Sequence, residues 1–346
     1  MNAGATHVLQ SIESLVKGWR ETGWNGTGVT AFPRAFLAGL LLSCAVVPGC
    51  RAEPQKSPRQ SAPTAAAVPT QSIRPETTGG FDGQRAMAHV EQLVALGPRP
   101  PGSEGIRRAQ QYIRAQLESY GCAVTEDDFH ASTPAGRVAM KNLVAKLPGQ
   151  RSDVLLLLTH YDTKRIPDFV GANDGGSSTG VMLELARLLC GEKNALTIWI
   201  AFLDGEEAFS EWSETDGAYG SRQLAAKLAV AGELKRIRAV ILADLVGDRE
   251  LNFRRESNST PWLTDLVWAT AARLGYQKHF LPEATAIEDD HIAFLRRGVP
   301  AVDIIDLDYV HWHTPADRLD KISPHSLGVV GHVILEVISE LKKKFR

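Results

Sequence analysis

Four continuous apolar runs constrain the fold of this chain more than any other feature of its sequence. Each is short, almost entirely apolar and followed by polar residues: VLLLLT (154–159), TIWIAFL (197–203), AVILA (239–243) and PAVDII (300–305). Runs of this length that lack polar/apolar alternation are typical of strands buried on both faces of a sheet. They predict a central sheet that is covered by other elements on both sides.

Helical periodicity lies between these runs. We expect a short strand at 142–149, ending in a turn, and helices at 106–121, 180–190, 221–229, 261–275, 289–298 and 326–345. Ser177, Ser178 and Thr179 are available to cap the second helix. Buried strands that alternate with helices are usually parallel. The sequence therefore predicts an α/β three-layer sandwich, in which helices flank a mostly parallel, mixed central sheet.

The first fifty residues read as a targeting segment. Arg34 precedes the apolar run AFLAGLLLSCAVV, which is too short to span a bilayer and suits the hydrophobic region of a signal peptide. The run ends in VVPGC, which is similar to a bacterial lipoprotein cleavage box with Cys50 as the lipidated residue. We expect export to the cell envelope or periplasm with a lipid anchor; simple secretion or an uncleaved signal anchor are the alternatives.

Composition divides the rest of the chain into a tether and a single folded domain. Residues 51–80 are rich in Pro, Ala, Ser and Thr and poor in large apolar residues, so they predict a disordered tether. Residues 81–346 are predicted to form one catalytic α/β domain. A net charge of -2 gives no electrostatic reason to expect nucleic acid. No Cys-x-x-Cys occurs, which excludes thiolate zinc sites of that type, and the spacing of Cys122 and Cys190 leaves their pairing open.

Polar residues of metal-ligand type follow each of the apolar runs. They are His160 after the first run, Asp174 in the next loop, the adjacent pair Glu206 and Glu207, Asp244, and His313. Each one alone is more typical of a turn or a solvated loop. The carboxyl ends of parallel strands meet at one edge of a sheet, however, so the residues should converge there. Imidazole and carboxylate ligands without cysteine suit zinc, and a spare glutamate beside the ligands suits a general base.

These segments resemble a known enzyme family. The similar stretches run from about Ala86 to the C-terminus and include FVGANDGG, FLDGEEAFSEWSETDGAYGSR, ADLVGD, EDDHIAFLRRGVP and VHWHTPADRLD. They resemble the zinc-dependent glutaminyl-peptide cyclotransferases of the animal type, which share the fold of the co-catalytic zinc aminopeptidases. The resemblance implies that peptides or proteins with N-terminal glutamine are converted to pyroglutamyl products with release of ammonia.

The resemblance also implies a role for each matching residue. One zinc ion would be bound by Asp174, Glu207 and His313, and Glu206 would be the general acid and base. Asp244 and Asp289 would form a hydrogen-bonded carboxyl pair that reaches Glu206. The substrate pocket would be formed by Trp212, Trp312 and Glu288.

The chain departs from the family pattern at several positions. Thr159 and Ser178 lie where the animal enzymes carry a cysteine pair near the metal, so no disulfide is expected there. Glu288 replaces a common glutamine, and Asp303 replaces a common histidine. These replacements concern the lining of the pocket and bear on which substrates it accepts.

Two other functions remain open at this point. In a dizinc aminopeptidase, His160 and Asp244 would bind a second metal and Glu206 would activate a water molecule. A catalytically inactive peptidase-like domain would act as a binding module, but such domains usually lose the ligands that survive here. We expect peptide substrates as partners, a monomer, and membrane contact only through the N-terminal segment.

Overall fold

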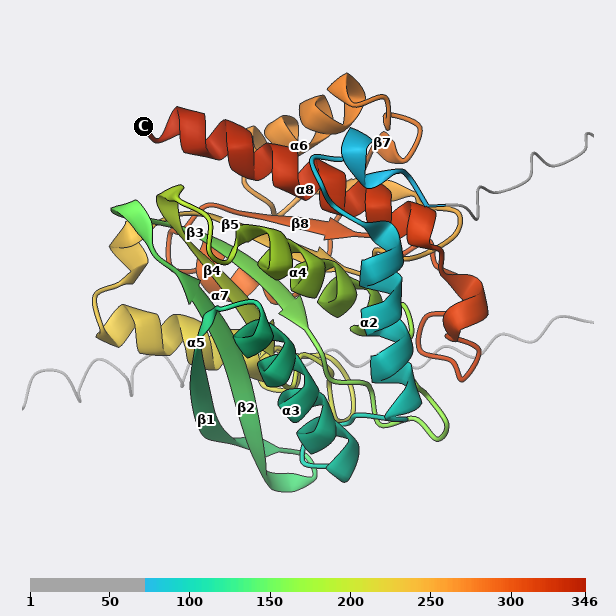
Figure 1. The fold of residues 1–346 in the computed structure, drawn as a ribbon. Helices are drawn as coiled ribbons and strands as arrows, with labels where there is room; N and C mark the ends of the chain where they lie inside the picture. The colour runs from blue at the N-terminus through green and yellow to red at the C-terminus, as the bar shows by residue number, and fades with distance from the viewer. Residues whose placement is uncertain (1–71) are drawn as a thin grey trace, which may run out of the picture. The chain divides into compact units, whose positions relative to one another are not determined.

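A six-stranded mixed sheet organises the part of the chain that the structure describes (Figure 1). The computed structural model describes residues 72–346. Its strands follow the order β1-β2-β4-β3-β5-β8, with bounds β1 Ala123–Thr133, β2 Gly136–Leu147, β3 Gly149–His160, β4 Asn194–Leu203, β5 Ile237–Asp244 and β8 Ala301–Ile305. The β4, β3, β5 and β8 strands are parallel to one another, whereas β2 is antiparallel to both β1 and β4. The predicted mostly parallel, mixed sheet is confirmed.

The apolar runs are buried on both faces of this sheet, as their lack of alternation predicts. In β3, Leu155 and Leu157 belong to one core cluster, whereas Val154, Leu156 and Leu158 belong to the other. Successive side chains of a strand point to opposite faces, so only an uninterrupted apolar run can fill both cores.

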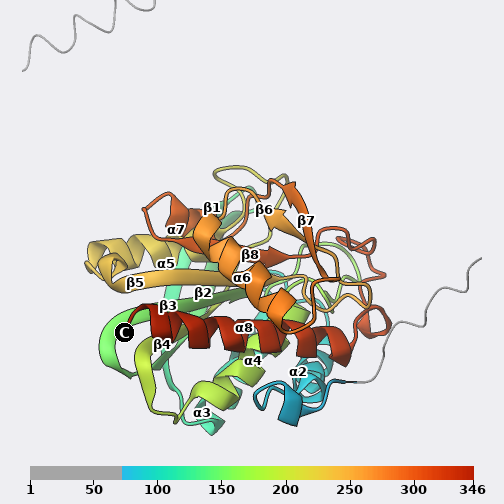
Figure 2. The same cartoon turned by 90° about the horizontal axis from the view of Figure 1, so that it is seen from above.

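Helices cover the two faces unequally, which completes the predicted three-layer sandwich (Figures 1 and 2). The larger core lies under α2 (Gly83–Ala95), α3 (Glu104–Ser119), α4 (Gly176–Leu189), α6 (Pro261–Arg273) and α8 (Pro324–Lys344). The smaller core lies under α5 (Tyr219–Val230) and α7 (Ile292–Leu295). Short 3₁₀ segments occur at Pro75–Thr77, Leu234–Arg236 and Leu319–Lys321, and a second two-stranded sheet pairs β6 (Phe253–Glu256) with β7 (Phe280–Thr285).

Several local predictions are wrong. The helix expected at 289–298 is only the four-residue α7: a turn precedes it, in which the amide of Ile292 donates to the carbonyl of Asp289, and after it Gly298 adopts a φ of 74° and the amide of Val299 donates back to Phe294. The expected caps of α4 lie inside the helix: its N-cap is Gly175, and the Ser177 hydroxyl donates to the carbonyl of Asn173 instead. The edge strand β1 and helix α2 lie outside the elements we expected.

The predicted tether extends too far towards the C-terminus. Within residues 72–80, Thr78 is fully buried and its hydroxyl donates to the carbonyl of Phe81 at 2.5 Å. Ile73 packs against the larger core. These contacts explain why a segment with few large apolar residues is nevertheless ordered against the domain. The predicted targeting segment, Cys50 and the remainder of the tether lie outside the described residues.

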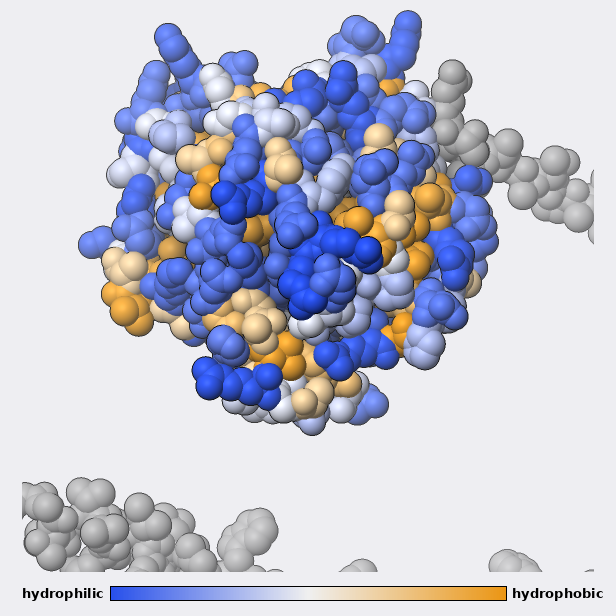
Figure 3. Space-filling model, turned by 60° about the horizontal axis from the view of Figure 1, so that its bottom comes forward, coloured by the Kyte–Doolittle hydropathy of each residue, from blue (hydrophilic) through white to orange (hydrophobic). Residues whose placement is uncertain are grey.

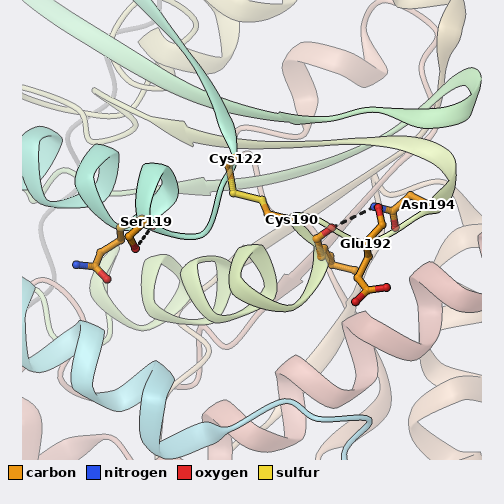
Figure 4. The surroundings of a disulfide bond; sticks show 7 residues. Ser119, Cys122, Cys190, Glu192 and Asn194 are labelled. Atoms are coloured by element: carbon orange, nitrogen blue, oxygen red, sulfur yellow. Dashed lines mark hydrogen bonds between the residues drawn. A yellow bond between two sulfur atoms is a disulfide. The ribbon is translucent and has the colours of Figure 1, made fainter.

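The open question about cysteine pairing is resolved by a disulfide between Cys122 and Cys190 (Figure 4). Cys122 follows α3 and Cys190 follows α4, and the bond closes a segment with a sequence separation of 68 residues. It therefore ties the ends of two neighbouring helices together beneath the sheet.

The face of the molecule seen in Figure 3 is mainly hydrophilic, with hydrophobic residues in small separate groups. Among residues 72–346, none of the helices combines the length and the apolar character that crossing a bilayer requires.

Candidate active site

The candidate site lies at the carboxyl edge of the parallel strands, where the sequence predicts it. His160 is the last residue of β3 and Asp244 the last residue of β5, and these two strands are neighbours in the sheet. Glu206 and Glu207 follow the end of β4 at Leu203. Ligand-type residues from the ends of three strands are brought together in this way.

Asp174, Glu207 and His313 form a cluster that could hold a metal ion. One ligand atom from each lies within 4.8 Å of the others. The Nε2 atom of His313 is 3.2 Å from Oε2 of Glu207 and 3.5 Å from Oδ2 of Asp174. Two carboxylate oxygens of this cluster, Oδ2 of Asp174 and Oε1 of Glu207, are buried and accept no hydrogen bond within residues 72–346. Buried carboxylate oxygens without donors are costly, and a divalent cation would satisfy them.

A second cluster shares Asp174 with the first. His160, Asp174 and Asp244 also place one ligand atom each within 4.8 Å of the others. Burial alone would lower the pKa of His160, but Asp244, Asp162 and Asp174 raise it well above its usual value. Because a protonated His160 is itself a cation between these carboxylates, the second cluster has an internal counter-charge. The geometry is compatible with one metal ion or with two.

The adjacent glutamates have unusual pKa values without a metal ion. Burial raises the pKa of Glu206 well above its usual value; His160 opposes the shift, and Glu207 and Asp289 add to it. Burial, together with Asp174, raises the pKa of Glu207 to about 7. Crowded carboxyls of this kind favour a bound cation, which would lower these pKa values.

Asp162 holds the turn that presents the two glutamates, a role that the sequence analysis missed. Its carboxylate accepts the backbone amide of Glu206 at 3.1 Å and that of Glu207 at 3.2 Å, and it lies 3.4 Å from Nδ1 of His160. One side chain therefore positions residues from two strands. Its place two residues after His160, just beyond the end of β3, was the available signal.

Arg99 and Asp317 anchor the loop that carries Asp174, and the sequence analysis missed both. Arg99 is fully buried and donates to the carbonyls of Val170 at 2.7 Å and Gly171 at 3.1 Å. Burial lowers its pKa to about 10, so it remains charged at neutral pH. Asp317 accepts the amide of Asp174 at 3.0 Å. The only signal for Arg99 was a charged residue inside the proline-rich stretch PRPPG.

An open pocket of about 300 Å³ lies over this cluster. Its lining contains nine of the ten predicted site residues: Asp174, Glu206, Glu207, Trp212, Asp244, Glu288, Asp289, Trp312 and His313. The tenth, His160, is buried beneath them with 1% exposure. The Trp312 ring stacks on His313 with centroids 4.1 Å apart. Gly217 has a φ of 112°, and a Cβ atom there would lie 2.7 Å from the Trp212 ring. A glycine at this position therefore leaves space for the Trp212 side chain.

The predicted hydrogen bond between Asp244 and Asp289 is absent from residues 72–346. Oδ1 of Asp244 instead accepts the amide of Leu245 at 2.8 Å and lies 3.0 Å from Nε2 of His160. Burial and the charge of Asp244 raise the pKa of Asp289 to about 6. No hydrogen bond joins the two carboxyls within residues 72–346, and the charge of Asp244 acts on Asp289 by repulsion.

Two departures from the family pattern have clear structural counterparts. The Thr159 hydroxyl donates to Oγ of Ser178 at 2.8 Å, so a hydrogen bond links the positions at which no disulfide was expected. Asp303 is fully buried, and its Oδ2 lies 3.8 Å from Nδ1 of His291.

Backbone strain also occurs at the candidate site. His313 and Leu245 have φ values of 53° and 49°, which are rare for residues with a side chain.

Comparisons with known proteins agree with this geometry. Residues 142–338 match the family described as Peptidase family M28. The chain is 34% identical over 294 residues to a glutaminyl-peptide cyclotransferase-like protein from Mus musculus, covering 76% of each chain. A glutaminyl cyclase from an Acidobacteriales bacterium superposes with a TM-score of 0.74 and 40% identity, over 82% of this chain and 99% of that one. A leucine aminopeptidase precursor from Bacteroides thetaiotaomicron follows with a TM-score of 0.70 and 28% identity, over 79% and 99%. The chain therefore belongs to Peptidase family M28 and, within it, to the glutaminyl-peptide cyclotransferases.

Proposed function

We propose that this protein is an enzyme that converts the N-terminal glutamine of peptides or proteins to pyroglutamate and releases ammonia. The observation that carries the proposal is the position of Glu206. Its largely buried carboxyl lines the pocket beside the Asp174–Glu207–His313 cluster, and Trp212 and Trp312 line the same pocket. The family to which the chain belongs supports the same activity.

We propose zinc as the metal, with Asp174, Glu207 and His313 as its ligands. Imidazole and carboxylate ligands suit this ion, and the unpartnered oxygens of Asp174 and Glu207 are explained by it. When bound, zinc would act as a Lewis acid on the side-chain carbonyl of the substrate glutamine. The resulting enzyme would be a zinc-dependent aminoacyltransferase.

The proton transfers and the positioning of the substrate depend on residues of the chain itself. The carboxyl-rich pocket attracts the α-ammonium group of the substrate, and Glu206 accepts a proton from it. The free amine then attacks the side-chain amide carbon, closing a five-membered ring. Glu206 returns this proton to the amide nitrogen, which departs as ammonia when its bond to the carbon breaks, and Glu206 takes up the second proton that the ring nitrogen loses as the lactam forms. Ring closure is intramolecular, so holding the reacting atoms close together supplies much of the acceleration. Trp212 and Trp312 reduce access of water to the site.

A dizinc aminopeptidase is the second candidate. It is favoured by one observation: His160, Asp174 and Asp244 form a second cluster that could hold a metal, next to the first. In that enzyme Glu206 would activate a water molecule. A catalytically inactive binding domain is the least favoured function, since all the proposed ligands and Glu206 are present.

Product analysis separates these functions. The protein is incubated with Gln-Ala-Ala and Leu-Ala-Ala, and the products are followed by mass spectrometry with an ammonia assay. A cyclotransferase removes ammonia from the first peptide and leaves the second intact. An aminopeptidase releases free amino acids, and a binding domain changes neither peptide. Release of free leucine without ammonia would overturn the proposed activity.

We also propose that the protein is exported and works in the cell envelope or outside the cell. Disulfides persist mainly in oxidising compartments, so the Cys122–Cys190 bond supports export. Lipid attachment at Cys50 and a monomeric state remain parts of this proposal. Mass analysis of the mature N-terminus after expression in a bacterial host tests the former, and light scattering of the purified protein tests the latter.

A further inference from the structure

We propose that a second pocket beside the candidate active site binds the residues that follow the N-terminal glutamine and favours an acidic side chain there. This inference rests on the proposed function and deepens it by naming the class of preferred substrates. The second pocket has a volume of about 220 Å³. It shares Trp212, Glu288 and Asp289 with the candidate active-site pocket.

The shared residues make the two pockets neighbours across Trp212. The far side of the second pocket is formed by the loop at Ser213–Ala218, by Arg222 of α5 and by residues in and after α7. Because the two pockets share three lining residues, a peptide chain that leaves the first pocket past Trp212 can enter the second with the residues that directly follow the glutamine. The first pocket has a volume of about 300 Å³, so the later residues of a longer peptide must extend from it into this second pocket or into the open solvent.

Three arginines line the second pocket, and two of them have no carboxylate partner. The guanidinium of Arg222 donates to the backbone carbonyls of Glu214 and Thr215, and Arg297 donates to the carbonyl of Ala293 at 2.8 Å. Within residues 72–346, neither arginine forms a salt bridge. Carbonyl acceptors orient a guanidinium without neutralising its charge, so both side chains remain positive at the pocket, although the charges of Asp290 and Asp216 act on Arg222.

Arg296 is the third arginine, and its ion pairs are weak. Its Nη2 atom lies 3.4 Å from Oε1 of Glu214 and 3.8 Å from Oε1 of Glu288. The side chains of Arg296, Glu214 and Glu288 are 51%, 80% and 54% exposed, so water competes for all of these contacts. A peptide carboxylate can therefore replace Glu214 or Glu288 as the partner of Arg296, and the guanidinium plane suits bidentate binding of such a group.

The charges of the two pockets are opposite in character. The first pocket is lined by seven carboxyl residues against Lys164 and His313. Three arginines face two exposed glutamates in the second pocket, and its remaining carboxyl, Asp289, is buried on the border with the first. A substrate that places its ammonium group in the first pocket and a carboxylate in the second is complementary in charge to both pockets. Lysine or arginine at the same substrate position would instead meet three like charges.

The test compares peptides that differ only in one downstream charge. We would measure kcat/KM for Gln-Ala-Glu-Ala, Gln-Ala-Lys-Ala and the corresponding Gln-Glu and Gln-Lys peptides, all amidated at the C-terminus. Glutamine amide, which has no residue for the second pocket, normalises each enzyme. We expect acidic peptides to exceed their lysine counterparts by about threefold to tenfold at low salt, mainly through KM, as several exposed ion pairs would give. The ratio should fall as the ionic strength rises.

A matched pair of variants separates local binding from the overall charge of the protein. Arg296→Gln removes one charge from the second pocket. Arg273→Gln removes the same charge from an arginine of similar exposure, 50%, that pairs with Glu336 on α8. We expect the acidic preference to shrink toward unity in Arg296→Gln and to persist in Arg273→Gln.

The outcomes separate this inference from the function on which it rests. If wild-type protein releases ammonia from all peptides at rates independent of downstream charge, or if both variants lose the preference equally, the second pocket has no such role while the cyclotransferase activity stands. If no ammonia is released even from glutamine amide, the proposed function itself is wrong.

Discussion

The Nε2 atom of His160 lies 3.0 Å from Oδ1 of Asp244, although 84 residues separate them along the chain. The two residues end neighbouring parallel strands, β3 and β5, so the sheet register brings them together. A site with one metal ion and a site with two would differ in the role that His160 has in this contact. As an imidazolium, His160 can neutralise Asp244 directly; as a neutral ligand, it would share a second metal with it.

Replacing Asp244 by Asn should distinguish the two designs. With one metal per chain, we expect Asp244→Asn to keep about one zinc and to lose most of its turnover, because only the carboxyl network around Glu206 is altered. With two metals, the same change should lower the content from about two ions to one. Elemental analysis of wild type and variant provides the measurement. A variant that retains two ions and full activity would contradict both designs.

Glu206 and Glu207 should respond differently to the same substitution. Glu207→Gln should lower zinc occupancy, because a carboxylate ligand becomes a weak neutral one. Glu206→Gln should keep the zinc and reduce kcat by about a hundredfold or more, as loss of a general base does. Zinc content and ammonia release are measured on both proteins. Loss of metal in Glu206→Gln with retention in Glu207→Gln would reverse the assignment.

Trp312→Ala should weaken substrate binding while the metal stays. The Trp312 ring stacks on His313 and is 45% exposed in the pocket, so its removal opens the site to water without removing a ligand. We expect KM for Gln-peptides to rise about tenfold, the loss expected for one aromatic contact of about 1.4 kcal/mol. Val310→Ala, an 83% exposed change in the same loop, serves as the control and should leave the kinetics unchanged. Equal kinetics in the two variants would remove Trp312 from the pocket.

Glu256 should make the stability of the fold depend on pH in the acid range. Burial alone would raise its pKa, but the hydrogen bond with His291 and those from the amides of Asn258 and Ile287 outweigh burial and lower the pKa to about 2. The contribution is complete above the unfolded value of 4.5 and is lost as the pH falls toward 2, because only the unfolded chain binds the proton in that interval. It amounts to something on the order of 3 kcal/mol.

Urea unfolding between about pH 5 and pH 2 measures this contribution. Glu256→Gln should be less stable at neutral pH and should lose that part of the pH dependence. Glu91→Gln, at an exposed position on α2, should keep the wild-type dependence. A Glu256→Gln protein with the same pH dependence as wild type would show that this carboxyl is not responsible.

Local sequence was sufficient for the elements whose burial shows in their composition. VLLLLT and TIWIAFL can satisfy both cores only as central strands, so their type and the class of fold follow directly from the chain. The edge strand β1 could not be predicted in this way, because Ala123–Thr133 is mostly polar and about half of its residues are exposed. Its strand form depends on pairing with β2, which is visible only in the folded sheet.

The candidate site was predictable to the same extent. His160, Asp174, Glu206, Glu207, Asp244 and His313 follow strands or lie in the loops between them, and parallel strands direct such residues to one edge. What the sequence by itself determined is therefore the layered fold and the set of ligand-type residues. The tertiary structure decided which residues hold them: Arg99, Asp162 and Asp317 act through backbone carbonyls and amides of distant loops. It also decided the Cys122–Cys190 bond and the arginine-lined pocket, since these depend on distances between segments that no local pattern encodes.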